Sequence, residues 1–162
     1  MAAHAALENL TVLDLTRVLA GPFCTMMLAD MGARVIKIEI PNGGDDTRAY
    51  PPFRANTEGE QESIYFANIN RNKKGITLNL KSEEGKKLFR DLVKKADIVV
   101  ENYRPGVMDK LGLGYDELRK INSRIIYGSV SGFGNTGPYR LRPGYDILAQ
   151  AMGGMMAITG TP

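Results

Sequence analysis

LDLTRVLAGP, residues 13–22, is the stretch that decides the fold of this chain. Its apolar beginning, together with Val12, predicts a short buried strand, and the Gly-Pro pair at its end predicts that a helix begins at Phe23. In parallel α/β sheets, ligands bind in the crevice outside the carboxyl ends of the strands. Because residues 16–19 directly follow the strand, we predict that they form a ligand-binding loop.

Three residues of this stretch have specific expected roles. Gly21 permits backbone geometry that is closed to other residues. Pro22 suits the first helical position, because its missing N–H would have no intrahelical partner there. Arg17 places a cation in the turn that faces the ligand. The alternative is an ordinary first turn without a ligand, since such turns occur in α/β proteins of many functions.

A second strand completes a strand–helix–strand unit. Residues 23–31 are rich in helix formers, and Gly32 is a suitable residue to end that helix. The segment RVIKIEI, residues 34–40, has an alternating pattern that predicts a strand whose two faces differ. The crossover is short and should be right-handed, so we expect the two strands to run parallel.

The alternation of strand and helix patterns continues along the chain. Ser82 is a suitable N-cap for a helix whose apolar residues, from 88 to 96, recur at helical spacing. These patterns predict an α/β fold, a mostly parallel sheet with helices on both faces. The further predicted strands are residues 76–80, 97–101 and 125–131, and the further predicted helices are 107–111, 115–121 and 145–152.

Three further segments could contribute to a site. Residues 41–62 contain several Gly and Pro residues and predict a long loop with binding candidates at 45–48 (Asp-Asp-Thr-Arg), or else a solvated excursion with a surface charge pair. Residues 102–106 follow the predicted strand 97–101 and therefore lie at its carboxyl end. The basic cluster 71–75 either serves the site or forms a solvated turn.

Composition narrows the class of protein. A chain of 162 residues with 43% hydrophobic content predicts one packed domain, and a net charge of +3 fits a small anionic ligand better than nucleic acid. Cys24 is the only cysteine, so we expect a buried structural thiol and a reducing compartment. No apolar run reaches a membrane span, and MAAHAALENL does not resemble a signal peptide. We expect a soluble protein without a metal site.

Gly132-Phe-Gly-Asn-Thr-Gly137 matches the G-x-G-x-x-G pattern of dinucleotide-binding turns. The context argues against that interpretation, because Pro138 and Pro143 prolong the loop where a nucleotide site needs the start of a helix. An NAD-dependent oxidoreductase is therefore an alternative hypothesis that this segment supports poorly.

Seven motifs together give the chain a specific resemblance to the amino-terminal portion of family III CoA-transferases, which include formyl-CoA transferase and carnitine CoA-transferase. The resemblance implies a Rossmann-like fold for residues 1–162, as the incomplete, CoA-binding part of a large domain. The motifs are LDLTRVLAGP (13–22), GARVIKIE (32–39), GDDTR (44–48), NRNKKGITLNLK (70–81), ADIVVENYRPG (96–106), SGFGNTGPY (131–139) and RPGYDILAQAMGGMMAITG (142–160).

The resemblance also implies a reaction. In this family an aspartate attacks an acyl-CoA thioester to give a mixed anhydride, and the CoA thiolate then returns to form an aspartyl-CoA thioester. A small carboxylic acid, in some members a dicarboxylic acid, accepts the CoA. The nucleophile of the family lies beyond the segment GGMMAITG (153–160), so we expect no catalytic residue here and an inactive, weakly CoA-binding fragment. We expect the full-length protein to form an interlocked homodimer.

The residues that resemble the CoA contacts of the family fall on four segments. CoA is a substrate here, and no permanently bound cofactor is expected. One contact is in doubt, because Ile40 occupies the position at which formyl-CoA transferase has a basic residue. The candidate residues are Arg17, Val18, Leu19, Ala20, Leu78, Asn79, Leu80, Lys81, Asn102, Tyr103, Arg104 and Lys110.

Two alternatives remain within the same resemblance. A 2-methylacyl-CoA racemase of this superfamily carries a proton-relay histidine in a G-H-D segment, where this chain has Gly144-Tyr145-Asp146. Tyrosine, with an ordinary pKa of about 10, is a poor base for that role. A non-catalytic CoA-binding or interaction module is the second alternative. We expect a cytoplasmic protein, or a mitochondrial-matrix protein if a targeting segment has been removed.

Overall fold

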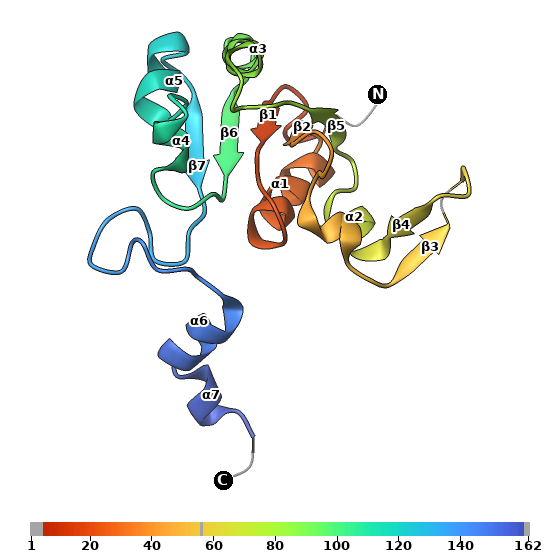
Figure 1. The fold of residues 1–162 in the computed structure, drawn as a ribbon, viewed down its shortest axis with the longest axis vertical. Helices are drawn as coiled ribbons and strands as arrows, with labels where there is room; N and C mark the ends of the chain where they lie inside the picture. The colour runs from red at the N-terminus through yellow and green to blue at the C-terminus, as the bar shows by residue number, and fades with distance from the viewer. Residues whose placement is uncertain (1–4, 56, 161–162) are drawn as a thin grey trace.

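A computed structural model describes residues 5–55 and 57–160 (Figure 1). The described residues form one five-stranded sheet in the order β5-β2-β1-β6-β7 and one two-stranded antiparallel hairpin. Every pairing within the five-stranded sheet is parallel, which confirms the predicted α/β class. The strands are β1 (Thr11–Asp14), β2 (Arg34–Glu39), β3 (Phe53–Ala55), β4 (Gln61–Ser63), β5 (Lys74–Thr77), β6 (Ile98–Glu101) and β7 (Ile126–Ser129).

Helices cover both faces of the sheet, as predicted. On one face, Leu13 and Leu15 pack in a cluster with Phe89 of α3 and Leu118 of α5. On the other face, Val12 packs with residues of α1 and its neighbouring strands. Successive side chains of β1 therefore pack into two apolar clusters on opposite faces of the sheet. The helices are α1 (Ala20–Asp30), η1 (Asp46–Ala49, a 3-10 helix), α2 (Ile64–Ile69), α3 (Glu83–Val93), α4 (Val107–Lys110), α5 (Tyr115–Ile121), α6 (Asp146–Met152) and α7 (Met155–Ile158).

The predicted start of α3 at Ser82 is confirmed. The Ser82 side chain accepts a hydrogen bond from the Gly85 N–H, and Glu83 and Glu84 occupy the first turn, where the helix dipole favours acidic residues. Phe89 is fully buried against the sheet. The helix is therefore fixed at its amino end by its cap and along its length by its apolar face.

The turn from β1 into α1 differs from its prediction. The helix begins at Ala20, three residues before Phe23, so Pro22 lies within the first turn and not at its first position. Val18 has a φ of 67°, so this residue adopts the left-handed conformation that we expected of Gly21. A Cβ on Gly21 would lie 2.4 Å from Thr16 Cβ, so this glycine is needed for a close approach of the loop.

Residues 41–62 are not a structureless loop. They contain η1 and the hairpin of β3 with β4, and Asp45 and Thr47 are buried, which rules out a solvated excursion at those two positions. Asp45 accepts a hydrogen bond from the Thr47 N–H at 3.0 Å and so caps η1. No strand was predicted here because β3 is only three residues long and all three of them are exposed.

Cys24 is exposed, so the predicted buried thiol is wrong. Helix α1 packs against the sheet partly through small residues, among them Gly21 and Ala29, and it leaves Phe23 and Met27 exposed. An apolar composition therefore did not identify the buried face of this helix.

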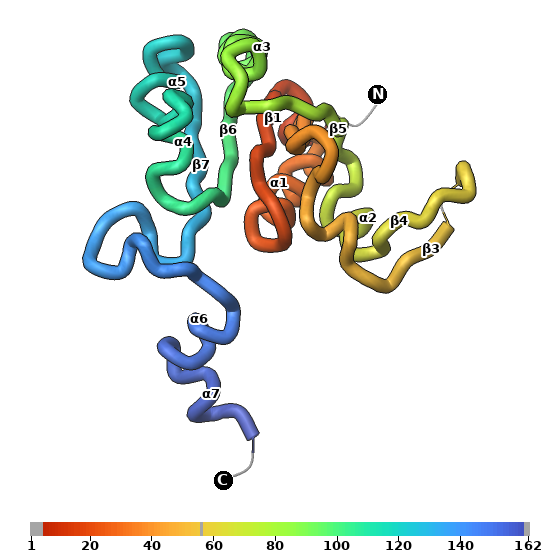
Figure 2. The backbone as a smooth tube through the Cα atoms, viewed as in Figure 1, coloured from red at the N-terminus to blue at the C-terminus, as the bar shows by residue number. Residues whose placement is uncertain are grey.

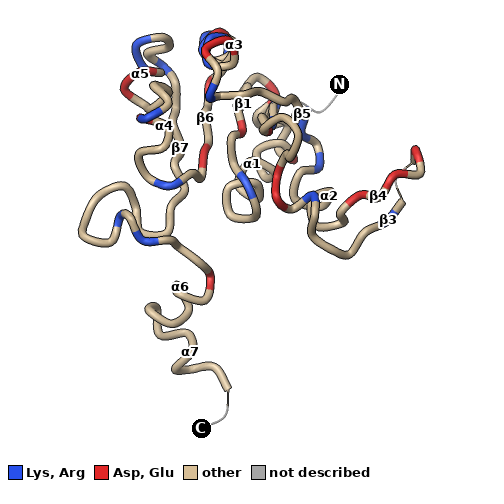
Figure 3. The backbone as a smooth tube through the Cα atoms, in the orientation of Figure 1, with Lys and Arg blue, Asp and Glu red and all other residues tan. Residues whose placement is uncertain are grey.

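Helices α6 and α7 extend away from the sheet as an arm, which the tube in Figure 2 follows to the carboxyl end. Neither helix contains a buried residue, and Ile158 is 81% exposed. Beyond an acidic residue at the start of α6, the arm is free of charge (Figure 3). In the described part of the chain, no helix is both long enough and apolar enough to cross a bilayer.

Candidate functional site

A cavity of about 930 Å³ lies at the carboxyl edge of the sheet. The segments that follow β1, β6 and β7 all contribute to it, because parallel strands end at the same edge. Its lining consists of Arg17, Val18, Leu19, Ala20, Asp46, Tyr65, Asn102, Tyr103, Arg104, Val107, Gly132, Phe133, Gly144, Tyr145, Asp146, Leu148 and Ala149.

Seven of the twelve candidate contacts line this cavity, and five do not. The loop residues 17–20 and the segment 102–104 come together there. Leu78, Asn79, Leu80, Lys81 and Lys110 lie outside its lining. The first four follow β5, which β2 separates from β1, and Leu80 is buried in the core. Lys110 ends the short helix α4.

Asn102 holds the backbone of Arg17. Its side-chain Oδ1 accepts a hydrogen bond from the Arg17 N–H at 2.8 Å, and its Nδ2 donates to the Arg17 carbonyl oxygen at 2.7 Å. Asn102 directly follows β6, which pairs with β1, so the amide side chain spans two adjacent strand ends. It fixes the position from which the Arg17 side chain enters the cavity.

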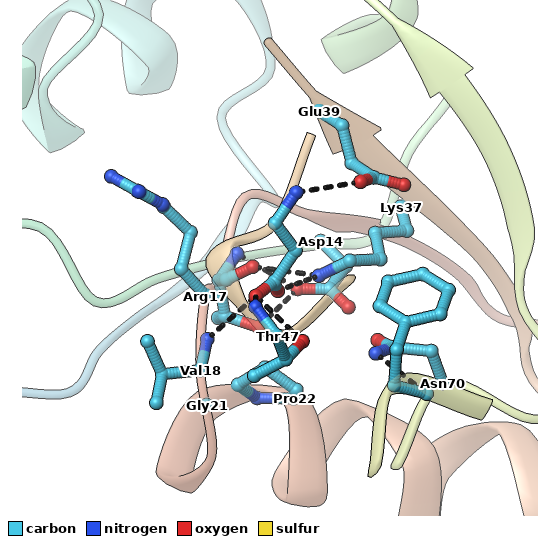
Figure 4. Close-up of polar contacts among 12 residues, drawn as sticks. Asp14, Arg17, Val18, Gly21, Pro22, Lys37, Glu39, Thr47 and Asn70 are labelled. Carbon is cyan, nitrogen blue, oxygen red and sulfur yellow. Dashed lines mark hydrogen bonds and ion pairs between the residues drawn. The ribbon is translucent and has the colours of Figure 1, made fainter. Parts of the chain in front are cut away.

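Lys37 and Asp45 form a buried ion pair next to the loop, and Figure 4 shows Lys37 among the polar contacts around Arg17 and Val18. Lys37 Nζ lies 2.9 Å from Asp45 Oδ2 and also donates to the Thr16 carbonyl oxygen at 2.8 Å. Asp45 Oδ1 accepts a hydrogen bond from the Val18 N–H at 3.2 Å. This pair therefore fixes the amino end of the loop and helps to hold Val18 in its left-handed conformation.

A second buried ion pair fixes the other end of the loop. Lys73 Nζ lies 3.1 Å from Asp14 Oδ2 and donates to the Pro22 carbonyl oxygen at 2.8 Å and to Asn70 Oδ1 at 2.9 Å. The Thr25 hydroxyl donates to the same Asp14 oxygen, Oδ2, at 2.7 Å. Lys73 is almost completely buried, so the solvated-turn alternative for the cluster 71–75 is wrong at this residue.

Burial and hydrogen bonding set the charge of these groups. Burial alone would raise the pKa of Asp45, but the Thr47 N–H and Lys37 lower it further than burial raises it, so the carboxylate is ionised. Burial is also the largest influence on Lys73, and it lowers the pKa of that ammonium against the opposing effect of Asp14. Both effects are expected where charges are buried as pairs.

The sequence reasoning missed several residues of the site. Lys37 gave one signal, since it shares the polar face of a strand with Glu39. The remaining residues gave none, because their place in the site depends on contacts between distant segments. The missed residues are Lys37, Tyr65, Val107, Phe133, Leu148 and Ala149.

The glycine-rich loop at 132–137 does not introduce a helix, since the next described helix begins at Asp146. A Cβ on Gly132 would lie 2.2 Å from the Gly144 Cα. The first glycine of the pattern is therefore needed where two parts of the loop touch, which differs from its role in a dinucleotide-binding turn.

The cavity can hold a ligand with both apolar and anionic parts. Its lining is largely apolar, and Arg17 and Arg104 supply cations. Arginine suits phosphate and carboxylate groups, because its donors match their oxygens. Among the described residues, no cluster of three or more His, Cys, Asp or Glu side chains could hold a metal ion.

The model of the family described as CoA-transferase family III matches residues 7–162. Acetyl-CoA:oxalate CoA-transferase of Acetobacter aceti is 55% identical, over 96% of this chain and 39% of its own length. Succinyl-CoA:glutarate CoA-transferase of Mus musculus is 52% identical, over 95% of this chain and 34% of its own length. The chain thus spans less than half the length of these curated relatives.

A solved structure shares the fold along almost the whole chain. The crystal structure of a CAIB/BAIF family protein from Brucella suis has a TM-score of 0.94 and 48% sequence identity. The match covers 99% of this chain and 42% of that one.

Proposed function

The chain belongs to CoA-transferase family III, and from this we propose that the protein containing it moves CoA from an acyl-CoA thioester to a small carboxylic acid. The observation that carries the proposal is the cavity at the sheet edge, whose lining includes seven of the residues expected to contact CoA. In the proposed complex, Arg17 and Arg104 face anionic groups of CoA. The apolar residues of the lining face its adenine or pantetheine parts.

The proposed reaction uses an aspartate nucleophile. Its carboxylate attacks the thioester carbonyl, the C–S bond breaks, and the products are a mixed anhydride and the CoA thiolate. The thiolate then attacks the aspartyl carbonyl of the anhydride, which releases the donor acid and leaves an aspartyl-CoA thioester. The acceptor carboxylate then attacks the aspartyl-CoA thioester, which gives a second mixed anhydride and releases the CoA thiolate. The thiolate attacks the acceptor carbonyl of this anhydride, which yields the new thioester and frees the aspartate.

We propose that this nucleophile lies outside residues 1–162. Two carboxylates near the loop are already engaged in buried ion pairs: Asp14 with Lys73, and Asp45 with Lys37. Asp146 accepts a hydrogen bond from Gln150. In this proposal residues 1–162 form the CoA-binding part of a larger domain, bind CoA weakly when isolated and do not turn over.

The names of the relatives support a dicarboxylic acid as the acceptor. The two curated relatives are named for oxalate and for glutarate, both of which carry two carboxylates. We further propose an interlocked homodimer located in the cytoplasm or the mitochondrial matrix.

The proposal is tested with the whole protein. Succinyl-CoA, acetyl-CoA and formyl-CoA are each incubated with a panel of mono- and dicarboxylic acids, and the new thioesters are separated by chromatography. We expect CoA exchange with at least one dicarboxylic acid, and absence of exchange across the whole panel would refute the function.

Two substitutions then test the site. Arg17→Gln and Arg104→Gln should each raise the KM for acyl-CoA about tenfold or more, because each removes a charged hydrogen-bond donor from the cavity. Arg124→Gln is the control, since Arg124 is exposed and lies outside the cavity lining. An equal rise in the KM for acyl-CoA in all three variants would contradict the placement of CoA in this cavity.

A further inference from the structure

Within the cavity, the carboxylate of Asp46 forms an ion pair with the guanidinium of Arg17. Both residues line it, and Arg17 Nη2 lies 2.6 Å from Asp46 Oδ1 and 2.6 Å from Asp46 Oδ2. An arginine that lines a proposed anion site is thus already neutralised by a carboxylate of the same chain. Any anionic ligand that uses Arg17 has to compete with Asp46.

The pairing leaves much of the arginine unused. Both carboxylate oxygens contact the single nitrogen Nη2, whereas a matched pair would use two nitrogens, each bound to its own oxygen. Arg17 Nε is buried and has no hydrogen-bond partner among the residues that the structure describes. If the partly exposed Arg17 side chain turns so that Nε faces the cavity, a phosphate or carboxylate that binds Nε together with a terminal nitrogen satisfies the guanidinium better than Asp46 does.

Both residues are held by their backbones, and their side chains are accessible. The Arg17 backbone is fixed by its two hydrogen bonds with Asn102. The backbone of Asp46 lies between two buried residues, Asp45 and Thr47. The side chains of Arg17 and Asp46 are 38% and 53% exposed. Asp46 can therefore leave Arg17 by rotating its side chain, without rearrangement of η1.

We propose that Asp46 is a resident counter-ion, which neutralises Arg17 in the empty site and is displaced from it by an anionic group of the substrate. The displacing group is a phosphate of CoA or a carboxylate of the acid. This inference rests on the proposed function. It makes Asp46 a specificity-determining residue, because a ligand without an anionic group near Arg17 leaves the ion pair intact.

The size of the effect follows from the exposure of the pair. Exposed ion pairs contribute little free energy, so their displacement costs an anionic ligand only a small factor in affinity. Removing the Asp46 charge should therefore tighten binding of that ligand about two- to fivefold at low ionic strength. Salt should reduce this difference, because it screens exposed charges.

The test uses the whole protein with Asp46→Asn, Arg17→Gln and the double variant. Asp91→Asn is the matched control, since Asp91 is an equally exposed carboxylate paired with Lys94 at 2.7 Å on α3. The measurements are the Kd of CoA and of dephospho-CoA by calorimetry, and the KM and kcat for each acid, at low and high salt.

We expect Asp46→Asn to lower the Kd or the KM of at least one ligand with little change in kcat. Asp91→Asn should leave every Kd and KM unchanged. The gain should be lost in the Arg17→Gln background. A lower Kd for CoA but not for dephospho-CoA identifies the 3′-phosphate as the displacing group. Equal tightening of both identifies the diphosphate, and a lower KM for the acid alone identifies its carboxylate.

Three results would overturn the inference. The first is that Asp46→Asn leaves the binding of every ligand unchanged or weaker. The others are that Asp46→Asn increases affinity equally in the Arg17→Gln background, or that Asp91→Asn increases affinity by the same factor. These results are distinct from failure of the proposed function. If the wild-type protein exchanges CoA but Asp46→Asn has no effect, only the counter-ion role fails. If the wild-type protein neither binds CoA nor exchanges it, both fail.

Discussion

Lys37 and Lys73 are two buried lysines that perform the same task at opposite ends of one loop. Each bridges an aspartate and a backbone carbonyl, at Thr16 for the first and at Pro22 for the second. Burying a charge costs several kcal/mol unless it is paired and hydrogen-bonded, so each lysine depends on its aspartate and each aspartate on its lysine. The binding loop is therefore stabilised by pairs in which neither member is dispensable.

Lys73→Met should destabilise the protein strongly. It leaves Asp14 as an unpaired buried charge, for which the expected cost is about 3–5 kcal/mol in the free energy of unfolding. Lys94→Met is the control, because Lys94 forms an exposed pair with Asp91 and its loss should cost less than about 1 kcal/mol. Urea denaturation measures both. Equal costs for the two variants would show that the buried pair contributes nothing special.

Asp45 should make the free energy of unfolding depend on pH. The pKa of Asp45 in the folded protein is lower than in the unfolded chain, so its contribution is complete above the unfolded value of about 3.9 and is lost as the pH falls through the folded value. Asp45→Asn should lower the free energy of unfolding at neutral pH and flatten its decrease in acid.

The comparison for Asp45 is Asp116→Asn, which changes an exposed carboxylate on α5. Denaturant titrations between about pH 2 and pH 7 cover the range in which the carboxylate becomes protonated. The expected result is that Asp116→Asn keeps the slope of the wild-type protein. An unaltered slope in Asp45→Asn would contradict the role assigned to the buried pair.

Single residues of the site were predictable where their chemistry depends on local position. Arg17 and Asn102 each follow a strand whose apolar pattern is plain in the sequence, and both reach the cavity. The structural use of Asn102, as a clamp on the Arg17 backbone, could not be predicted, because it requires β1 and β6 to be neighbours. Lys73 was ambiguous for the same reason, since its partner Asp14 lies at the end of another strand.

At the scale of elements, the turn between β1 and α1 has no room for a side chain on Gly21. Gly21→Ala should destabilise the protein by about 1–3 kcal/mol, because its Cβ would lie 2.4 Å from Thr16 Cβ and force the loop outward. Gly75→Ala is the control, since a Cβ there would meet no heavy atom within 4 Å. Thermal or urea unfolding compares the two, and equal stability would refute the close packing.

Elements with a one-sided apolar pattern were predicted well, and those without one were not. Helix α3 begins at its predicted cap and buries Phe89 as its spacing indicated. The β3–β4 hairpin escaped prediction because its strands are mostly exposed and pair only with each other. The burial of Cys24 was mispredicted because α1 is apolar on its exposed side as well as its buried side.

At the scale of the whole molecule, the arm of α6 and α7 should add little to stability. None of its residues is buried, and several of its large apolar side chains, such as Ile147 and Ile158, are exposed. A chain of residues 1–145 should therefore unfold within about 0.5 kcal/mol of residues 1–162. It should also bind less of a hydrophobic dye, because the exposed apolar surface is smaller.

Urea denaturation and dye fluorescence of the two chains check this expectation. A large loss of stability on removing residues 146–162 would mean that the arm packs against the sheet in solution. Unchanged dye binding would place the accessible apolar surface elsewhere, for example on the exposed face of α1, where Phe23 and Met27 lie.

The bond from Lys73 to the Pro22 carbonyl also imposes an order on events during synthesis of the chain. These two residues are 51 positions apart, so the contact cannot form until residue 73 has left the ribosome. A nascent chain that ends after β2 already holds both strands of the first strand–helix–strand unit, but neither Lys73 nor the strand that positions it. The loop between Thr16 and Pro22 should therefore take its final shape late, and a growing chain should gain affinity for ligand only after β5 has joined the sheet.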